Sequence, residues 1–142
     1  MSLPGETRQA YDRLIGLLDQ EIRKRSGSTK DLERFRAILD EAFYLLGWAQ
    51  FEYLVKKQAK DIIDDKIKTK TIDRHAWRHL KVSGGIGQHL DLAFHADPAI
   101  RAKLGKDYNV RNGVAHEHKP FPPGVRDISA WLENLNDLVE KF

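Results

Sequence analysis

The segment Arg111-Asn112-Gly113-Val114-Ala115-His116 (the motif) holds the side chains best suited to chemistry on a phosphodiester. Arginine binds phosphate oxygens through two parallel hydrogen bonds, and histidine gains and loses protons near neutral pH. Asn112 and His116 are four residues apart and share a helix face, toward which the long side chain of Arg111 can swing. From residue types alone, the competing interpretation is a surface arginine and a histidine that interacts with a helix end.

The other histidines do not predict a metal site. His75 and His79 have the spacing of zinc ligands on a helix, but the neighbouring residues Arg74 and Arg78 repel a cation. The chain has no cysteine, so thiolate sites are excluded. His118 could assist His116, but its position after the motif favours an ordinary loop residue. We therefore expect neither a metal nor a cofactor.

Residues 56–81 are strongly basic. They contain nine Lys and Arg residues against four Asp, although the net charge of the chain is only +3. From charge alone such a segment is more often a solvated lysine-rich helix end, and the alternative is a face that meets phosphate, which we predict to lie beside the motif. The predicted RNA-binding residues of this segment are Lys66, Lys68, Lys70, Arg74 and Arg78.

Apolar residues recur every three to four positions, which predicts helices. Four long helices are expected. The first two cover residues 6–25 and 30–68, the third starts at Pro98 after the capping residue Asp97, and the apolar stripe of the last begins at Ile128. Short helices are expected over residues 73–81 and 86–96. We therefore predict an all-α, up-and-down helical bundle of four main helices with short additional helices, forming a single domain over residues 1–142.

The second predicted helix carries an unusually wide apolar stripe. Such a stripe predicts burial against more than one neighbour or against a second copy of the chain. Its main line is Phe35, Ile38, Leu39, Ala42, Leu46, Ala49 and Tyr53, thickened by Phe43, Leu45, Trp48 and Phe51. The first helix has a narrower stripe of Tyr11, Leu14, Ile15, Leu18 and Ile22.

The sequence lacks the features of membrane and secreted proteins. No run approaches the ~20 apolar residues of a membrane span, and the N-terminus has no apolar segment of a signal peptide. A chain without cysteine is compatible with a reducing compartment. We expect a cytoplasmic protein that does not contact a membrane.

In this helical setting, the motif resembles the Arg-x(4–6)-His signature of the HEPN family, in its Arg-Asn-x-x-x-His form. Residues 48–53, Trp-Ala-Gln-Phe-Glu-Tyr, resemble the aromatic, acid-bearing second helix of that family. The motif also precedes a proline-rich loop and one last helix, as in the family. The resemblance implies a homodimeric helical bundle that acts as a metal-independent endoribonuclease in a toxin or defence context. It further implies an antitoxin or nucleotidyltransferase-type partner.

The resemblance also assigns roles to residues. Arg111 and His116 are the implied catalytic pair, with Asn112 shaping the site, and two copies of the motif face each other across a dimer. The RNA 2′-hydroxyl attacks the adjacent phosphorus, His116 acts in proton transfer, and Arg111 stabilises charge on the phosphoryl oxygens. Glu52 is expected to anchor Arg111 or the dimer.

Two other functions compete with the nuclease. Glu117 stands where the family often has a glycine after the motif histidine. This acid favours a HEPN-like module that binds RNA, a nucleotide or a protein without cutting. The third alternative is a structural adaptor in which Arg111 and His116 only cap a helix.

Overall fold

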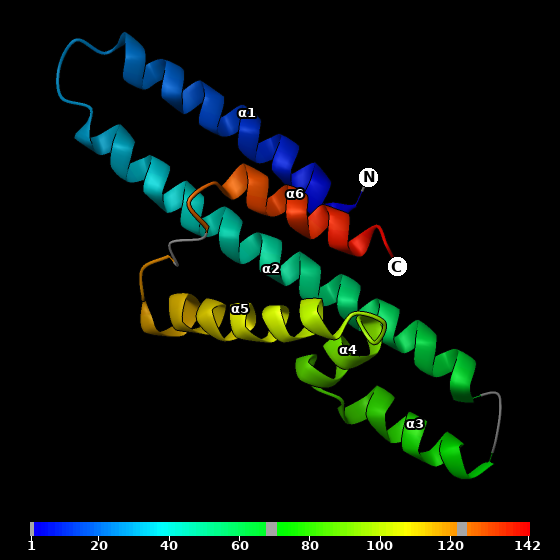
Figure 1. Ribbon diagram of the computed structural model, residues 1–142. Helices are drawn as coiled ribbons and strands as arrows, with labels where there is room; N and C mark the ends of the chain where they lie inside the picture. Colours follow the sequence, from blue (N-terminus) through cyan, green and yellow to red (C-terminus); the bar gives the residue numbers. More distant parts are fainter. Residues whose placement is uncertain (1, 68–70, 122–124) are drawn as a thin grey trace. The chain divides into compact units, whose positions relative to one another are not determined.

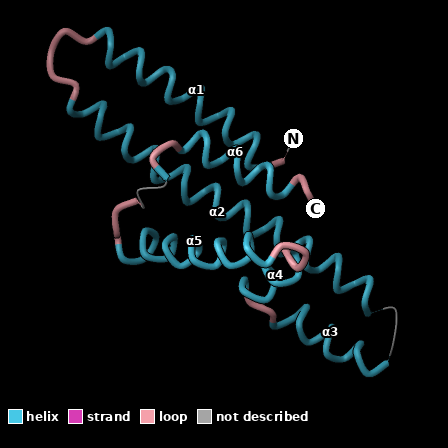
Figure 2. The backbone as a smooth tube through the Cα atoms, viewed as in Figure 1, coloured by secondary structure: helices cyan, strands magenta, loops and turns pink. Residues whose placement is uncertain are grey.

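The structure, a computed structural model, describes residues 2–67, 71–121 and 125–142, and of residues 67 and 71–73 the backbone alone. All the regular structure in these ranges is helical, so the all-α prediction is confirmed (Figures 1 and 2). The helices are α1 (Leu3–Lys24), α2 (Lys30–Ile67), α3 (Thr71–Ser83), α4 (Ile86–Ala93), α5 (Pro98–Glu117) and α6 (Ile128–Val139).

The chain divides into two compact units that share α2. The first unit comprises Met1–Phe51 and Lys119–Lys141, and the second comprises Glu52–His118 with Phe142. A single domain over residues 1–142 stays a prediction.

In the first unit, α1 and the start of α2 form an antiparallel pair. The Thr7 hydroxyl donates to Gln50 at 2.8 Å near one end, and Arg36 donates to Asp19 at 3.0 Å near the other. Helix α6 packs antiparallel to α1, since Ser2 at the start of α1 donates to Asn136 near the end of α6 at 2.5 Å, and Arg8, farther along α1, donates to Ser129 near the start of α6 at 3.2 Å. Figure 1 shows these three helices side by side.

Aromatic rings from α2 and α6 fill the core of the first unit. The Trp131 ring lies 4.9 Å from the Tyr44 ring and 6.1 Å from the Trp48 ring, measured between centroids. Gly47 makes this approach possible, because a Cβ atom there would lie 2.6 Å from the Trp131 ring and 2.7 Å from a Leu132 methyl.

In the second unit, the end of α2 packs with α3, α4 and α5. Helix α5 begins as predicted: Asp97 caps it by accepting a hydrogen bond from the Ile100 N–H at 3.1 Å, and Pro98 takes the first helical position. Helix α4 ends at Ala93 rather than Ala96, because the chain turns at residues 94–96. The buried residues of this unit include Val55, Ala59, Ile63, Leu90, Leu104 and Val114.

The predicted apolar stripe of α2 is not the buried one. Phe35, Ile38 and Leu46 are 51%, 56% and 44% exposed, and Tyr53 is 58% exposed. The helix is apolar on two sides, so its periodicity predicted an apolar face without showing which one the bundle covers. Trp48 and Phe51, which thicken the predicted stripe, are buried as expected, and the structure also buries Tyr44, Val55, Ala59 and Ile63.

The stripe of α1 is correct only in part. Tyr11 and Ile15 are buried, Leu18 and Ile22 are half-buried, and Leu14 is exposed. Among the described residues, none of the helices has the length and apolar character that crossing a membrane requires.

Candidate functional site

The motif occupies the last turns of α5. His118 ends the helix in the left-handed conformation, with φ of 53°, and its backbone N–H donates to the Gly113 carbonyl. This C-cap closes the helix two residues after His116. His118 is therefore a helix-ending residue in the structure, and its exposed side chain has no hydrogen bond in the described part of the chain.

Arg111 is held by three neighbours in the second unit. Its Nη2 lies 3.4 Å from Oε1 of Glu52 on α2, its Nη1 donates to Oδ1 of Asn112 at 2.9 Å, and its Cζ lies 5.5 Å from the centroid of the Tyr108 ring. The Arg111 side chain is 19% exposed and that of Glu52 is 28% exposed. The anchor that sequence reasoning expected in Glu52 is thus in contact with Arg111.

The bond to Asn112 joins two adjacent side chains that normally diverge on a helix. It places Nη1 of Arg111 next to Asn112, which shares a helix face with His116. The Nε atom of Arg111 is buried and has no hydrogen-bond partner among the described residues. The guanidinium is consequently oriented without having all of its donors satisfied.

The structure brings together Arg111, Asn112, Glu52 and Tyr108, but not His116. The His116 side chain is exposed, and in the described ranges no hydrogen bond or ion pair joins it to Arg111. One chain therefore presents an anchored arginine and, one turn beyond Asn112, a histidine open to solvent.

The predicted basic residues lie away from the motif. Lys66 is exposed near the end of α2, Arg78 is exposed on α3, and Arg74 is half-buried there. An ion pair between Lys81 and Asp64 joins α3 to α2. Asp64 lies about 18 Å from Glu52 along the axis of α2, at a rise of 1.5 Å per residue.

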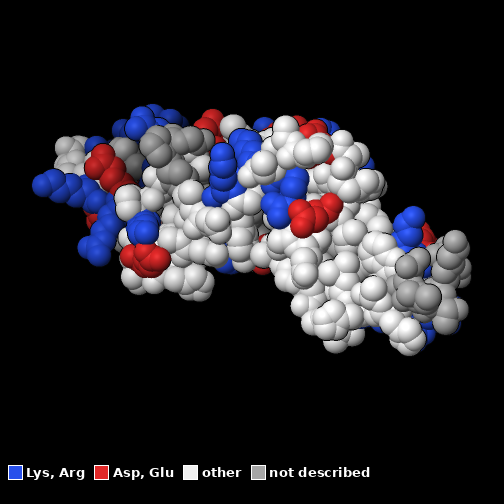
Figure 3. Space-filling view, turned by 60° about the horizontal axis from the view of Figure 1, so that its bottom comes forward, with Lys and Arg blue, Asp and Glu red and all other residues white. Residues whose placement is uncertain are grey.

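Phosphate contacts by Lys66, Arg74 and Arg78 stay a prediction. Helix α3 packs on the part of α2 that carries Asp64, whereas Arg111 of the motif contacts Glu52, the first residue of α2 in the second unit. Lys68 and Lys70 lie outside the described residues. On the face drawn in Figure 3, Lys and Arg gather in small groups interspersed with acidic side chains.

Sequence reasoning gave no role to Tyr108 or to the hollow beside it. Tyr108 contacts Arg111 and also lines a hollow of about 450 Å³ between α4 and α5. The spacing of three residues between Tyr108 and Arg111 on a predicted helix was the available signal. The hollow depends on how α4 packs against α5, for which the sequence holds no comparable signal.

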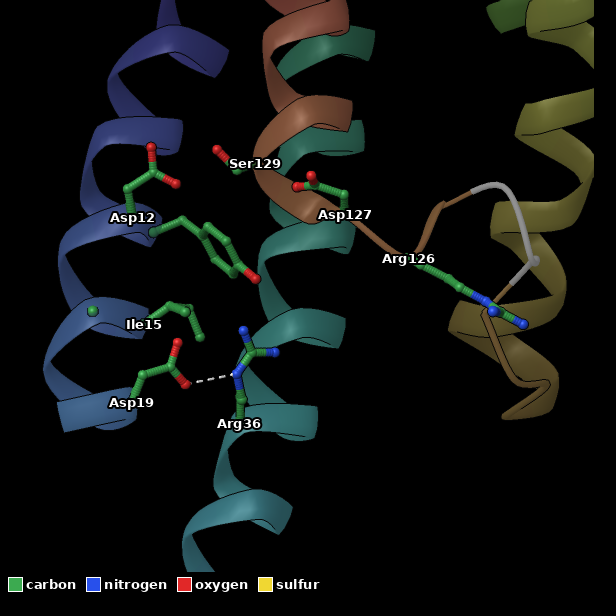
Figure 4. Close-up of a pocket in the computed structure, with 9 residues that line it drawn as sticks. Asp12, Ile15, Asp19, Arg36, Arg126, Asp127 and Ser129 are labelled. Carbon is green, nitrogen blue, oxygen red and sulfur yellow. Dashed lines mark hydrogen bonds and ion pairs between the residues drawn. The ribbon is translucent and has the colours of Figure 1, made fainter. Parts of the chain in front are cut away.

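A second hollow, of about 410 Å³, lies in the first unit (Figure 4). Its charged groups have partners or point out of it: Arg36 donates to Asp19, Asp127 caps α6 through the Ala130 N–H, and the Arg126 side chain points away. The Tyr11 hydroxyl donates to Asp40 at 2.6 Å, and burial together with this carboxylate raises the pKa of Tyr11 above its ordinary value. These paired groups do not form a reactive centre.

Within the described ranges, no group of three or more His, Asp or Glu side chains is arranged to hold a metal ion. No protein-family model matches the sequence, and searches of curated proteins and of solved structures return no significant match.

Proposed function

We propose that this protein is a metal-independent endoribonuclease of the HEPN type, with Arg111 and His116 as its catalytic residues and Asn112 shaping the site. The observation that carries the proposal is the anchoring of Arg111 by Glu52 and Asn112. A guanidinium held in one orientation before the substrate arrives stabilises charge that develops on a phosphoryl group without reorganising.

The reaction needs one proton removed and one delivered. The 2′-hydroxyl oxygen of a ribose attacks the neighbouring phosphorus and loses its proton to a base, while the bond from phosphorus to the 5′-oxygen breaks and that oxygen receives a proton. The products are a 2′,3′-cyclic phosphate and a 5′-hydroxyl. Because His116 is exposed, a histidine from each of two copies can reach one phosphate and serve as base and acid.

The proposal includes a homodimer. The exposed side chains of Phe35, Ile38 and Leu46 recur along one side of α2 within the first unit. Exposed apolar residues in such a row mark a protein interaction surface more often than isolated ones do. A second copy of the chain is the occupant that also supplies the second His116. An antitoxin or nucleotidyltransferase-type partner belongs to the same proposal.

Analysis of the RNA ends tests the chemistry. Cleavage of a labelled single-stranded RNA should leave 2′,3′-cyclic phosphate and 5′-hydroxyl ends. Arg111→Lys should recover little of the activity lost in Arg111→Ala, because a point charge does not replace the planar fork. Products with 5′-phosphate ends, or full activity of Arg111→Lys, would contradict the mechanism.

A non-catalytic HEPN-like binding module is the second candidate. Two acids favour it: Glu52 offsets the charge of Arg111, and Glu117 directly follows His116. Glu117→Gly separates the candidates. The change should leave the activity of a nuclease unchanged or raised, whereas a wild type without activity that still binds RNA would support the module.

A further inference from the structure

The hollow between α4 and α5 lies in the same unit as the motif. Helix α4 contributes Gly87 to its wall, and α5 contributes Arg101, Gly105, Lys106, Tyr108 and Asn109. The two glycines carry no side chains, and this leaves the space open. At Gly87 an added Cβ would meet only the Arg101 guanidinium, at 3.8 Å.

Arg101 forms a fixed part of this wall. Its Nε donates to Asp91 at 2.6 Å and its Nη2 donates to the Gly87 carbonyl at 3.1 Å, which ties α5 to α4. A Cβ atom at Gly105 would lie 2.8 Å from Nη1 of Arg101, so glycine lets the guanidinium lie flat against α5. The charge of Arg101 is thereby offset, and its Nε and Nη2 donors are engaged.

Lys106 and Asn109, in contrast, have spare hydrogen-bonding capacity. Both are exposed, and in the part of the chain that the structure describes neither forms a hydrogen bond or an ion pair. An amide offers a donor and an acceptor side by side, and an ammonium offers a charge to a phosphate. Both groups border a hollow with an aromatic ring in its wall.

Tyr108 connects the hollow to the motif, because it lines the hollow and also lies against the Arg111 guanidinium. Tyr108 is three residues from both Gly105 and Arg111, so it is the neighbour of each on the surface of α5. Gly105 and Arg111 are about 9 Å apart along the axis at 1.5 Å per residue. The hollow is therefore close enough to receive the nucleotide next to a phosphate bound at Arg111.

We infer that this hollow binds the base of the RNA nucleotide adjacent to the scissile phosphate. The inference rests on the proposed function. The base stacks on Tyr108, Asn109 pairs with its edge, and Lys106 meets the next phosphate. Unpaired bases in single-stranded RNA offer both their faces and their edges, and proteins recognise them by aromatic stacking and hydrogen bonding.

The test measures RNA binding without cleavage. The full chain carrying His116→Ala is titrated against a fluorescently labelled single-stranded oligoadenylate, and anisotropy gives the dissociation constant. Three further changes are added singly. Lys106→Ala and Asn109→Ala remove exposed groups that the fold does not need, and Gly87→Leu fills the hollow. Lys103→Ala is the control, because Lys103 is also exposed on α5 but pairs with Asp107 and does not line the hollow.

Each of the three changes should raise the dissociation constant. The increase should be roughly tenfold for Gly87→Leu, which displaces a stacked base. Lys103→Ala should change the dissociation constant less than Lys106→Ala does. Unchanged binding in Lys106→Ala and Asn109→Ala would overturn the inference, and so would equal losses in Lys106→Ala and Lys103→Ala. Cleavage by the chain with His116 intact is assayed separately. If the chain with His116 cleaves RNA but the changes in the hollow leave binding unaffected, only the base subsite is contradicted. If that chain does not cleave RNA but binding depends on the hollow, only the nuclease function is contradicted.

Discussion

Glu52 and Arg111 form a half-buried ion pair between α2 and α5, with 3.4 Å between Oε1 and Nη2. The pair joins the acid-bearing part of the long helix to the motif. Because Arg111 also donates to Asn112, Glu52 determines where the guanidinium lies relative to the helix face that carries His116. Glu52 is therefore a positioning residue for the proposed reaction.

Glu52→Gln should lower the cleavage rate at saturating RNA several-fold, because the neutral amide holds the guanidinium less firmly. The free energy of unfolding should fall by about 1–3 kcal/mol, since the two side chains are only 19% and 28% exposed and the change leaves the charge of Arg111 without its partner. Glu133→Gln is the matched control, because Glu133 pairs with Arg8 in the first unit. Equal loss of activity in the two variants, or full activity of Glu52→Gln, would show that the pair has no role in positioning.

Two glycines in helices should respond in opposite ways to alanine. At Gly47 a Cβ would lie 2.6 Å from Trp131, and at Gly16 it would meet nothing within 4 Å. Gly47→Ala should destabilise the protein by roughly 1–3 kcal/mol through overpacking, whereas Gly16→Ala should stabilise it by about 0.5–1 kcal/mol. Urea unfolding measures both. Similar effects of the two changes would contradict the close approach of α6 at Gly47.

The elements that the sequence predicted well are those with local signals. Asp97 followed by Pro98 marked the start of α5, and the prolines after residue 119 marked the end of the motif helix, because caps and proline act over one turn. Residue types alone left the motif with two interpretations, and its role in catalysis came from the family resemblance. Its contact with Glu52 followed from the family resemblance and not from any local pattern.

The elements that the sequence predicted poorly depend on packing between distant segments. The α2 periodicity was compatible with burial of either Ile38 or Trp48, because both lie on apolar sides of the same helix. Similarly, the hollow beside Tyr108 is lined by residues of both α4 and α5, including Gly87 and Gly105, which lie far apart in the sequence.

His89 should make stability depend on pH. It is buried, its Nε2 has no hydrogen-bond partner among the described residues, and burial together with Lys56 and Lys60 lowers its pKa below the ordinary 6.5. Between 6.5 and that lower pKa, the unfolded chain binds a proton that the folded chain does not. The contribution of the neutral His89 to the free energy of unfolding is therefore fully present above pH 6.5. It is lost as the pH falls below 6.5, by up to about 1.4 kcal/mol per pH unit.

The His89→Leu variant checks this dependence. Urea unfolding at several pH values should show a shallower slope below 6.5 in this variant than in the wild type. His95→Leu, which removes an exposed histidine, should keep the wild-type slope. Identical slopes in the wild type and His89→Leu would show that His89 titrates normally in the folded state.

The exposed stripe of α2 predicts the oligomeric state. Multi-angle light scattering at micromolar concentration should give the mass of a dimer for the wild type. Ile38→Lys, which places a charge among the exposed apolar side chains of α2, should shift the mass toward that of a monomer. Val82→Lys is the control, since Val82 is 87% exposed on α3. A monomeric wild type would contradict the proposed dimer.

The most direct test of the central claim is cleavage of single-stranded RNA in the presence of EDTA by the wild type, by His116→Ala and by His95→Ala. Proton transfer by a placed side chain contributes on the order of 10²–10⁴-fold. We expect the wild type and His95→Ala to cleave RNA without divalent metal, and His116→Ala to lose activity by that factor while staying folded. Identical RNA patterns from the wild type and His116→Ala would contradict the assignment of a nuclease.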